Sequence, residues 1–390
     1  MLRILTLLLL TPLLLASCGQ ADTSNTDTAK ATAVKDEKAD DKPAIQLDKI
    51  KLPKGFQIEL YAEKVDNARS ISLSPSGTLF VGTRNKGHLY ALRDTDGDYK
   101  VDKNYTLAKK LDMPNGVAFK DGSLYVAEIS TILRYDDIEN QLDNPPKATV
   151  VYDEYPKARH HGWKYIAFGP DGKLYVPVGA PCNICESKEE IFNSITRINP
   201  DGSGFEIVQE GVRNTVGFTW HPDNNELWFT DNGRDWMGDD MPACELNHAP
   251  KDYMHFGYPY CHQGDTPDPD YGYKHPCSDF TPPSQKMMPH SAPLGLEFCP
   301  SGNFPESYTK QILVAEHGSW NRSKKSGYRI MMIKLEGDKV LSYETFAEGW
   351  LDREADKFWG RPVDLEFLPD GSLLVSDDYA DAIYRISYQG

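Results

Sequence analysis

The stretch that decides the fold is Arg159–Val178, which reads RHHGWKYIAFGPDGKLYVPV. Its second half predicts a β-hairpin, because the turn Gly169-Pro-Asp-Gly172 separates two runs of apolar, β-branched and aromatic residues. Such a turn between such runs is a strong short-range hairpin signal. Its first half is different. His160 and His161 come just before the strand begins, where a side chain can face a cavity instead of a core.

The same hairpin recurs along the chain. Six segments place a short polar turn between strand-like runs: Leu73–Val81, Phe119–Val126, Phe168–Val176, Trp220–Phe229, Phe298–Ala315 and Phe367–Val375. The spacing is about 45–50 residues at first and grows later, where insertions rich in Cys, Pro and Tyr intervene. Helical periodicity is nearly absent. The pattern therefore predicts an all-β fold, a six-bladed β-propeller.

Two further features bear on how the propeller is completed. Phe56–Leu60 and Ala382–Ile386 are both strand-like, and they could share a blade and close the ring, which would remove exposed sheet edges. The stretch from about residue 233 to 293 is too irregular for blade strands. We expect it to form loop insertions over one face.

The N-terminus predicts export. Residues 1–17 combine one early positive charge, a Leu-rich run and small residues, as in a secretory signal peptide rather than a membrane span. Leu15-Ala-Ser-Cys18 resembles a bacterial lipobox, in which Cys18 is lipidated; the alternative is ordinary cleavage beside an incidental cysteine. Residues 18–48 lack aromatics and are predicted to be a disordered tether, with the propeller at 49–390. We expect a protein held to the bacterial membrane by its lipid alone, on the periplasmic side of the outer membrane or at the cell surface.

Charge and cysteine usage narrow the class of protein. The formal net charge is −16 and no basic stripe is present, which excludes nucleic acid as a partner. Beyond Cys18 there are six cysteines, and an even number in an exported chain predicts disulfides, although six cysteines allow 15 connectivities. They are Cys182, Cys185, Cys244, Cys261, Cys277 and Cys299.

The Cys182-Asn-Ile-Cys185 pair has several interpretations. A local structural disulfide is favoured over a redox pair or half of a zinc site, since no second pair stands at a suitable spacing. Haem attachment is excluded because Glu186 stands where a histidine would be needed.

Basic and amide side chains flank the hairpins, where a propeller presents residues to its central channel. So many cations in an acidic protein repel one another unless a polyanion binds, which predicts a planar, multiply charged ligand held by bidentate guanidinium contacts. The alternative is that several of them form surface salt bridges. The residues are Arg84, Asn85, Lys157, His160, His161, Arg213, Asn214, Arg234, His317, Arg322 and Arg361.

Several motifs carry a resemblance to a known family. His161-Gly162, the FGPDGKLY run and Gly211–Asn214 resemble the soluble quinoprotein sugar dehydrogenases, and Gly257–Cys261 and Glu316–Arg322 (EHGSWNR) are similar to the sorbosone/pyranose dehydrogenase branch. The resemblance covers essentially the whole chain after the tether. It implies a six-bladed propeller that binds pyrroloquinoline quinone (PQQ) and calcium and oxidises an aldose or sorbosone-type sugar. No haem motif is present, so electrons would pass to a separate acceptor, a cytochrome or a quinone.

The resemblance also assigns roles. His161 matches the catalytic base, which takes the hydroxyl proton of the sugar while hydride passes to the quinone; His160 is its competitor. Arg213 matches the arginine that steadies the quinone oxygen, and Asn214 is its neighbour in the cofactor site. The remaining matches are backbone carbonyls for calcium at Gly233 and Arg234, and cofactor-binding cations at Arg84, Lys157, Arg322 and Arg361.

The chain also departs from the family. A lysine of the soluble glucose enzymes near the fifth blade is not evident, and His317 or Arg322 occupies that neighbourhood. Val178-Gly-Ala180 ends the third hairpin where an acidic residue often follows the glycine, which puts substrate contacts there in doubt.

A second candidate metal site is independent of the resemblance. Asp94, Asp96, Asp98 and Asp102 occupy positions 1, 3, 5 and 9 of a loop that resembles an EF-hand loop without its final Glu. Calcium there would stiffen the outer connection of the first blade. The alternative is a solvated acidic turn, because Asp-Gly clusters are also turn formers.

Two other functions compete with a dehydrogenase. A calcium-dependent propeller hydrolase of the lactonase type needs a metal held by carboxylates on the axis, and the predicted axial positions are mostly basic. A non-catalytic propeller used for binding is the third possibility, suggested by the tether and the divergent fifth blade.

Overall fold

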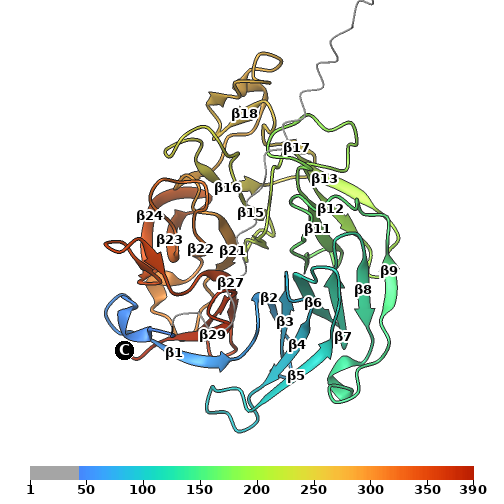
Figure 1. Ribbon diagram of the computed structural model, residues 1–390, viewed down its shortest axis with the longest axis vertical. Coiled ribbons are helices and arrows are strands. Elements are labelled where there is room, and N and C mark those ends of the chain that lie inside the picture. Colours follow the sequence, from blue (N-terminus) through green and yellow to red (C-terminus); the bar gives the residue numbers. More distant parts are fainter. Residues whose placement is uncertain (1–43) are drawn as a thin grey trace, which may run out of the picture. The chain divides into compact units, whose positions relative to one another are not determined.

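Six sheets follow one another around a central axis (Figure 1). The structure is a computed structural model that describes residues 44–390. The predicted signal peptide, Cys18 and the tether up to residue 43 lie outside the described residues. The predicted all-β, six-bladed propeller is confirmed. No helix in the described range is long and apolar enough to cross a membrane.

In the first three blades the strands are hydrogen-bonded in chain order from the axis outward, and β17 joins the third blade in parallel. The strands are β2 (Ala68–Leu73), β3 (Leu79–Thr83), β4 (Leu89–Arg93) and β5 (Lys103–Ala108); β6 (Gly116–Lys120), β7 (Ser123–Ala127), β8 (Ile132–Tyr135) and β9 (Thr149–Tyr152); and β10 (Ala167–Phe168), β11 (Leu174–Val178), β12 (Ser194–Ile198), β13 (Glu206–Glu210) and β17 (Met254–His255).

The last three blades repeat this order, and the sixth takes its outermost strand from the start of the domain. The strands are β14 (Phe218–Trp220), β15 (Leu227–Asp231), β16 (Cys244–Ala249) and β20 (Gln285–Met287); β21 (Pro293–Phe298), β22 (Ile312–Glu316), β23 (Arg329–Glu336) and β24 (Lys339–Glu348); and β27 (Pro362–Phe367), β28 (Leu373–Asp377), β29 (Ala382–Tyr388) and β1 (Phe56–Glu63).

Short elements decorate the blades. Two small ribbons pair β18 (Cys261–His262) with β19 (Thr266–Pro267) and β25 (Leu351–Asp352) with β26 (Lys357–Phe358). The 3₁₀ helices are η2 (Leu47–Lys49), η3 (Ile138–Asn140), η4 (Cys277–Asp279) and η5 (Glu306–Tyr308).

The six predicted hairpins are the ones that join the inner strand of each blade to its second strand. In the third hairpin Gly172 has a φ of 76° and donates its N–H to the carbonyl of Gly169 at 2.8 Å. A left-handed φ is accessible to glycine without steric cost, which is why the turn carries it. The fourth hairpin has Asn225 at φ 60° instead, another residue that tolerates this conformation.

The ring closes as predicted. Strand β1 pairs with β29 from Phe56 opposite Tyr388 to Glu63 opposite Ala382, so the two ends of the domain share the sixth blade. The predicted end of the tether at residue 48 is wrong, because Ile45 and Leu47 pack against the core between the fifth and sixth blades. Residues 44–48 therefore belong to the folded unit.

The core is divided into clusters between successive blades. Leu79 and Val81 of β3 pack toward the sixth blade, while Phe80 between them packs toward the second. Successive side chains of a strand point to opposite faces of its sheet, so a strand covered by a blade on each side is apolar throughout. This explains the unbroken apolar runs of the hairpins.

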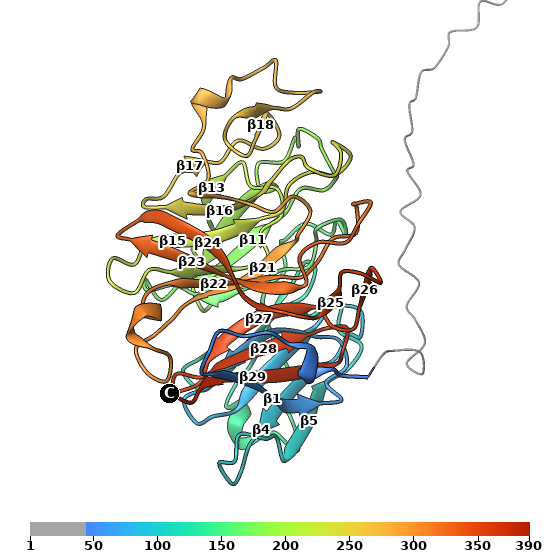
Figure 2. The same ribbon diagram turned by 90° about the vertical axis from the view of Figure 1, so that its left-hand side faces the viewer.

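The prediction that residues 233–293 form only loops is partly wrong. Strands β16 and β20 within this stretch complete the fourth blade. Buried Glu245 and Asn247 interrupt the apolar pattern of β16, which hid the strand from a periodicity argument. The rest of the stretch carries β18 and projects beyond the blades in both views (Figures 1 and 2).

The cysteines form fewer bonds than their even number predicts. Cys182–Cys185 is the favoured local disulfide, and Cys261–Cys277 ties the β18 excursion to η4. Cys244 and Cys299 are buried thiols, and burial raises the pKa of Cys244 to about 11. They act as small apolar core residues.

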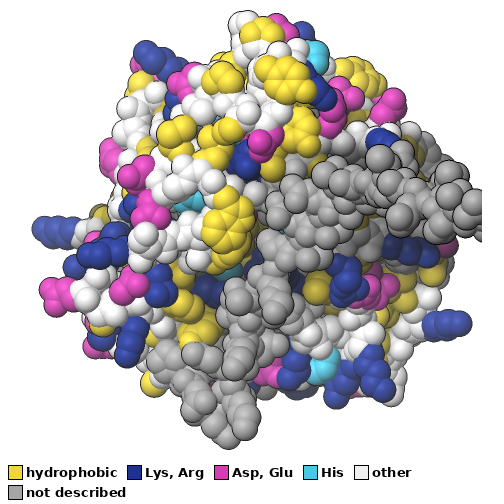
Figure 3. Space-filling view, turned by 45° about the horizontal axis from the view of Figure 1, so that its top comes forward, with side chains coloured by type: hydrophobic (Ala, Val, Ile, Leu, Met, Phe, Trp, Pro, Cys, Tyr) yellow, Lys and Arg dark blue, Asp and Glu magenta, His cyan; other side chains and the backbone are white. Residues whose placement is uncertain are grey.

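Acidic and basic side chains are interspersed on the face shown in Figure 3. The net charge of −16 is therefore not gathered into a single acidic region on this face.

Carboxyl groups line the inner strands β21 and β27, and they make stability depend on pH. Burial raises the pKa of Asp364 to about 7 and that of Glu366 to about 8. The unfolded groups titrate near pH 4, so the folded state binds more protons between about pH 4 and 8 and its stability falls as pH rises through that window. We expect Glu366→Gln, a neutral isostere, to stabilise the protein by about 1 kcal/mol or more at pH 8 and little at pH 5.

Thermal unfolding of this variant at the two pH values measures the effect. Glu336→Gln, at an exposed site, is the matched control and should change neither value. An equal change at pH 5 and pH 8 would contradict the assignment.

Candidate functional site

His161 lies in the loop before β10 with its backbone in the left-handed region, at φ 50°. Its Nδ1 is 2.9 Å from the carbonyl oxygen of Ala180. A carbonyl oxygen only accepts, so Nδ1 carries the proton and Nε2 carries the lone pair. Burial, followed by the charge of Arg213, holds the pKa of His161 well below its usual value. The ring is therefore a neutral, oriented proton acceptor.

The backbone of Ala180 joins His161 to Arg213. Its N–H donates to the carbonyl of Arg213 at 2.8 Å, and its own carbonyl accepts from His161. Gly179 makes room for this arrangement, since a Cβ there would lie 2.7 Å from Cβ of His161. Ala180 thus contributes backbone groups to this site.

The neighbouring His160 lacks the anchor that His161 has. The His160 ring is exposed and stacks edge-on to His161 at a centroid distance of 4.1 Å. No hydrogen bond to another described residue fixes its nitrogens. The geometry thus favours His161 over His160 as the base.

Arg213 is almost fully buried and held on four sides. Its Nε donates to Asn183 O at 2.9 Å and its Nη2 to Asn183 Oδ1 at 2.8 Å. Its Nη1 donates to Asn232 O at 3.0 Å, and its Nη2 reaches Asp235 at 3.3 Å. A guanidinium has five N–H groups, so one on Nη1 is left for a ligand. Asn183 lies inside the Cys182–Cys185 loop, which gives that disulfide a positioning role.

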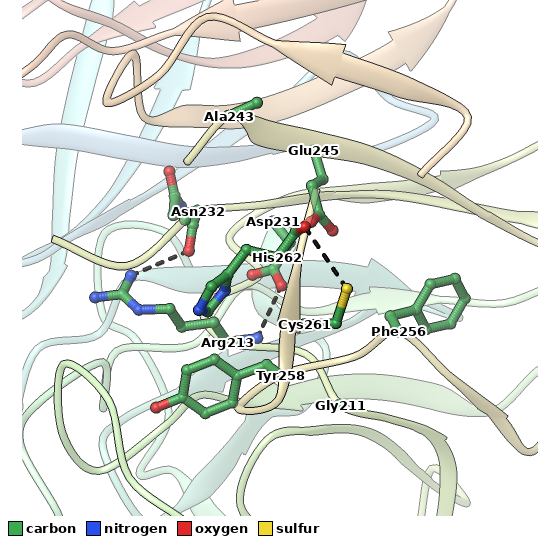
Figure 4. A pocket seen from close by; sticks show the side chains of 11 residues that line it. Gly211, Arg213, Asp231, Asn232, Ala243, Glu245, Phe256, Tyr258, Cys261 and His262 are labelled. Atoms are coloured by element: carbon green, nitrogen blue, oxygen red, sulfur yellow. Dashed lines mark hydrogen bonds between the residues drawn. The ribbon is translucent and has the colours of Figure 1, made fainter. Parts of the chain in front are cut away.

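Asp231, at the end of β15, is a site residue that sequence reasoning missed. Its two carboxylate oxygens accept the backbone N–H groups of Arg213 at 2.8 Å and Asn214 at 2.6 Å. Burial raises its pKa to about 6. The side chain of Asn232 then donates to the carbonyl of Asn214 at 3.0 Å. Asp231 and Asn232 together fix the Arg213-Asn214 turn. Figure 4 shows both residues beside Arg213.

The predicted calcium carbonyls adjoin a pocket rich in oxygen atoms. Its lining residues are Gly211, Arg213, Asp231, Asn232, Gly233, Ala243, Glu245, Phe256, Tyr258, Cys261 and His262 (Figure 4). Asn232 Oδ1 is buried with no hydrogen-bond partner among residues 44–390. Glu245 stands opposite Asp231 across the β15–β16 ladder, and burial together with that neighbour raises its pKa to about 8. The guanidinium of Arg234 is paired to buried Asp268, whose carboxylate also binds the pocket residue His262 at 2.8 Å.

A second group of charges gathers at the axis around Asp378, which follows β28. Its carboxylate pairs with Arg69 at 2.8 Å, with Arg361 at 3.1 Å and with His317 at 3.0 Å. Burial acts to raise the pKa of Asp378, but these partners overcome it and hold the pKa well below the usual value. We call these four residues the axial cluster. It places two arginines and a histidine against one carboxylate.

Arg84 adjoins the axial cluster without a carboxylate of its own. Its guanidinium lies 3.6 Å over the ring of Trp163, and its Nε is buried without a partner among the described residues. Burial and the charge of Arg69 lower its pKa to about 10, so it is still a cation at neutral pH. Trp163 also contacts His161 at a ring distance of 6.2 Å. Arg84 therefore lies between the axial cluster and the loop that carries His161.

Two predicted cofactor-binding cations lie elsewhere. Lys157 is exposed and has no hydrogen bond or ion pair to any described residue. Arg322 donates to the carbonyl of Asp239 and to the carboxylate of Asp240. Neither is hydrogen-bonded to the axial cluster or to Arg84, so their assignment to the cofactor stays a prediction.

The predicted EF-hand-like loop brings three of its four carboxylates together. Oxygens of Asp94, Asp96 and Asp102 lie within 4.8 Å of one another. Asp98 is not part of this group, and its carboxylate accepts the N–H of Lys100 at 2.8 Å. Asp94 also accepts backbone N–H groups, as a plain acidic turn does. Calcium in this loop stays a prediction.

Comparison with known proteins identifies the family. A family model described as TrAA12-like matches residues 50–389. The chain belongs to the TrAA12-like family. A protein of Borreliella burgdorferi named only as uncharacterized is 34% identical over 359 residues, which cover 87% of this chain and 91% of that protein. The predicted resemblance to PQQ-dependent sugar dehydrogenases is confirmed.

Solved structures share the fold at low sequence identity. The PQQ domain of Coprinopsis cinerea pyranose dehydrogenase in its holo form matches with a TM-score of 0.75 and 18% identity over 87% of this chain and 97% of its own. A calcium structure of Trichoderma reesei Carbohydrate-Active Enzymes Family AA12 gives 0.77 and 18% over 90% and 98%. The PQQ-bound aldose sugar dehydrogenase of Streptomyces coelicolor gives 0.63 and 19% over 86% and 99%.

The site residues that sequence reasoning missed differ in how much signal the sequence held for them. Arg69 stands at the start of the inner strand of the first blade, as Arg213 and Arg361 precede the inner strands of theirs. This place near the start of an inner strand was its only signal, because alignment on the turn glycines Gly77 and Gly371 matches Arg69 with Val363 and not with Arg361. Asn183 and Asp235 carried no such signal, because their roles depend on irregular loops that fold toward Arg213.

Proposed function

We propose that this protein is a PQQ- and calcium-dependent dehydrogenase that oxidises an aldose or sorbosone-type sugar, with His161 as general base. The observation that carries the proposal is the neutral His161 ring, anchored through Nδ1, between a held arginine and a cluster with unmet positive charge. Membership of the TrAA12-like family supports the same function.

The residues present fit PQQ, a planar tricarboxylate. Arg84 offers an unpartnered buried Nε, and the arginines of the axial cluster outnumber its one carboxylate. Carboxylates of a ligand would meet charge-assisted donors there. Calcium would be held by oxygen atoms near Gly233 and Arg234, where Asn232 Oδ1 lacks a partner. When bound, PQQ supplies the two-electron acceptor for hydride from the sugar.

The chain's own residues supply the acid–base chemistry. Nε2 of His161 accepts the proton of the hydroxyl whose carbon is oxidised, and the carbonyl of Ala180 stabilises the resulting imidazolium through Nδ1–H. The free Nη1 proton of Arg213 donates to negative charge that develops in the transition state. Because Arg213 is already bound to Asn183 and Asn232, it needs no reorganisation during the reaction.

The proposal also covers where the enzyme is located and which partner accepts its electrons. The predicted signal peptide and Cys18 support an exported, lipid-anchored enzyme. A separate cytochrome or quinone would receive the electrons. We do not retain a lactonase-type hydrolase, since the axial residues near Asp378 are cationic rather than a carboxylate cage for a metal.

Reconstitution with PQQ and calcium tests the proposal. Replacing Arg84 tests the proposed cofactor contacts most directly. We expect purified protein to bind PQQ, and its absorbance to change on addition of an aldose. Arg84→Leu should weaken PQQ binding about 10–100-fold, because a charge-assisted hydrogen bond contributes about 1.5–3 kcal/mol. Isothermal titration of the apo protein measures the affinity.

Arg353→Leu is the matched control, since Arg353 is exposed at the β25–β26 ribbon. It should bind PQQ like the unmodified protein. Absence of PQQ binding, or of spectral reduction by any aldose tried, would overturn the proposed function.

A further inference from the structure

Two tryptophans differ from the rest in exposure. Trp236 and Trp320 are each 65% exposed, whereas Trp228, Trp350 and Trp359 are buried at 3% or less. The two exposed rings contact each other edge to face, with centroids 5.6 Å apart and an interplanar angle of 86°. Exposing two large indole rings side by side is costly unless they have a ligand. We call them the tryptophan pair.

The tryptophan pair is connected on both sides to the candidate site. Trp236 follows Asp235, whose carboxylate contacts Arg213, in the loop after β15. Trp320 comes three residues after His317, which contacts Asp378, in the loop after β22. The pair thus joins the fourth and fifth blades next to the proposed catalytic and cofactor-binding residues.

Polar contacts hold these loops to each other. Arg322 donates to the carbonyl of Asp239 and pairs with Asp240 at 3.0 Å, and the N–H of Ser323 donates to Asp239 at 3.0 Å. His290 also contacts the carbonyl of Gly238 at 2.8 Å. The rings are therefore presented on connected loops. The same loops carry charged groups, among them the carboxylate of Asp240, 88% exposed.

We propose that the tryptophan pair is a binding platform for a pyranose ring other than the one that reacts, so that the substrate is the chain end of an oligosaccharide. The inference rests on the proposed function for the identity of the reacting ring. A pyranose packs its C–H face on an indole and directs its hydroxyls sideways, where Asp240 and Arg322 can bind them. Two aromatic rings on loops that also carry charged groups suit one or two sugar units. A stable protein partner needs about 800 Å² per side, with a larger apolar centre.

Binding to the apo protein tests the platform independently of catalysis. Isothermal titration would use cellotetraose, maltotetraose and xylotetraose, each compared with its monosaccharide. We expect at least one tetrasaccharide to bind about 10-fold or more tighter than its monosaccharide, and Trp236→Ala and Trp320→Ala each to lose about 10-fold of that affinity. Tyr273→Ala, at a side chain 82% exposed on the β18 excursion, is the control and should bind like the unmodified protein.

With the reconstituted enzyme, the two tryptophan variants should raise KM for the tetrasaccharide and leave PQQ affinity and kcat with the monosaccharide unchanged. If apo protein binds the tetrasaccharide through the pair but no sugar reduces bound PQQ, the platform stands and the proposed function fails. Equal tetrasaccharide affinity of both variants and the unmodified protein would overturn the platform. Variants that keep sugar affinity but turn over slowly only with cytochrome c would also overturn it, because the pair would then be a docking surface for the electron acceptor.

Discussion

Replacing His161 by alanine is expected to lower kcat by about 10²–10⁴-fold, the range that a positioned general base contributes. The loss follows from geometry. Nδ1–H is fixed to the carbonyl of Ala180, so Nε2 is the nitrogen that would accept the hydroxyl proton in the proposed reaction, and the ring of the adjacent His160 has no such anchor among the described residues. PQQ affinity should stay near that of the unmodified protein, because the proposed carboxylate contacts come from Arg84 and the axial cluster. Dye-linked turnover and titration with PQQ measure the two quantities separately.

The matched control is His160→Ala. Its ring touches His161 but is exposed and unanchored, so we expect less than about a 5-fold change in kcat. A loss as large as that of His161→Ala would reverse the assignment between the two histidines.

The pH dependence of kcat gives a further readout of His161. Burial and Arg213 hold its pKa well below the usual value, so the base stays neutral across pH 6–8. We expect a plateau there and a fall only at acid pH, as the imidazole becomes protonated. A rise in kcat centred near pH 6.5 would instead indicate a solvated histidine.

The fold was predictable because each blade repeats one local signal. The turn Gly169–Gly172 and its counterparts depend on glycine or asparagine at a left-handed φ, and the apolar runs beside them are buried on both faces. Strand β16 escaped prediction because Glu245 and Asn247 lie in it with their side chains buried. Buried polar side chains thus interrupted the apolar periodicity from which a strand is usually read.

The residues of the candidate site were likewise only partly predictable from the sequence. His161, Arg213 and Asn214 could be assigned because they stand in short motifs beside a hairpin. Asp378 could not be, since two of its three partners, Arg69 and His317, approach it from other blades. Sequence spacing within one repeat carries no information on contacts between repeats. The same limit explains Arg322, which matched a motif but pairs with the Asp239–Asp240 loop.

Replacing Asp378 by alanine is expected to destabilise the protein by about 3–5 kcal/mol, since removal of one partner leaves buried charges uncompensated. Arg69 is 2% exposed and would keep only its hydrogen bond to Asn115, while Arg361 and His317 would lose their carboxylate. Urea unfolding of the apo protein measures the loss. Asp143→Ala, at an exposed position, is the control and should stay within about 0.5 kcal/mol of the unmodified protein.

The same variant separates a structural role of Asp378 from a role in setting the charge of the cofactor site. If the axial cluster binds carboxylates of PQQ, the cofactor replaces the missing anion, and PQQ should raise Tm more in Asp378→Ala than in the unmodified protein. Ligand that binds only the folded state stabilises it in proportion to its affinity there, so the larger shift reports tighter binding to the variant. Equal shifts would show that the cluster balances its own charge and takes no part in holding the cofactor. The excess of cations around Asp378 would then stabilise the closure of the ring, where β2, β27 and the loop after β28 meet. It would take no part in chemistry at the axis.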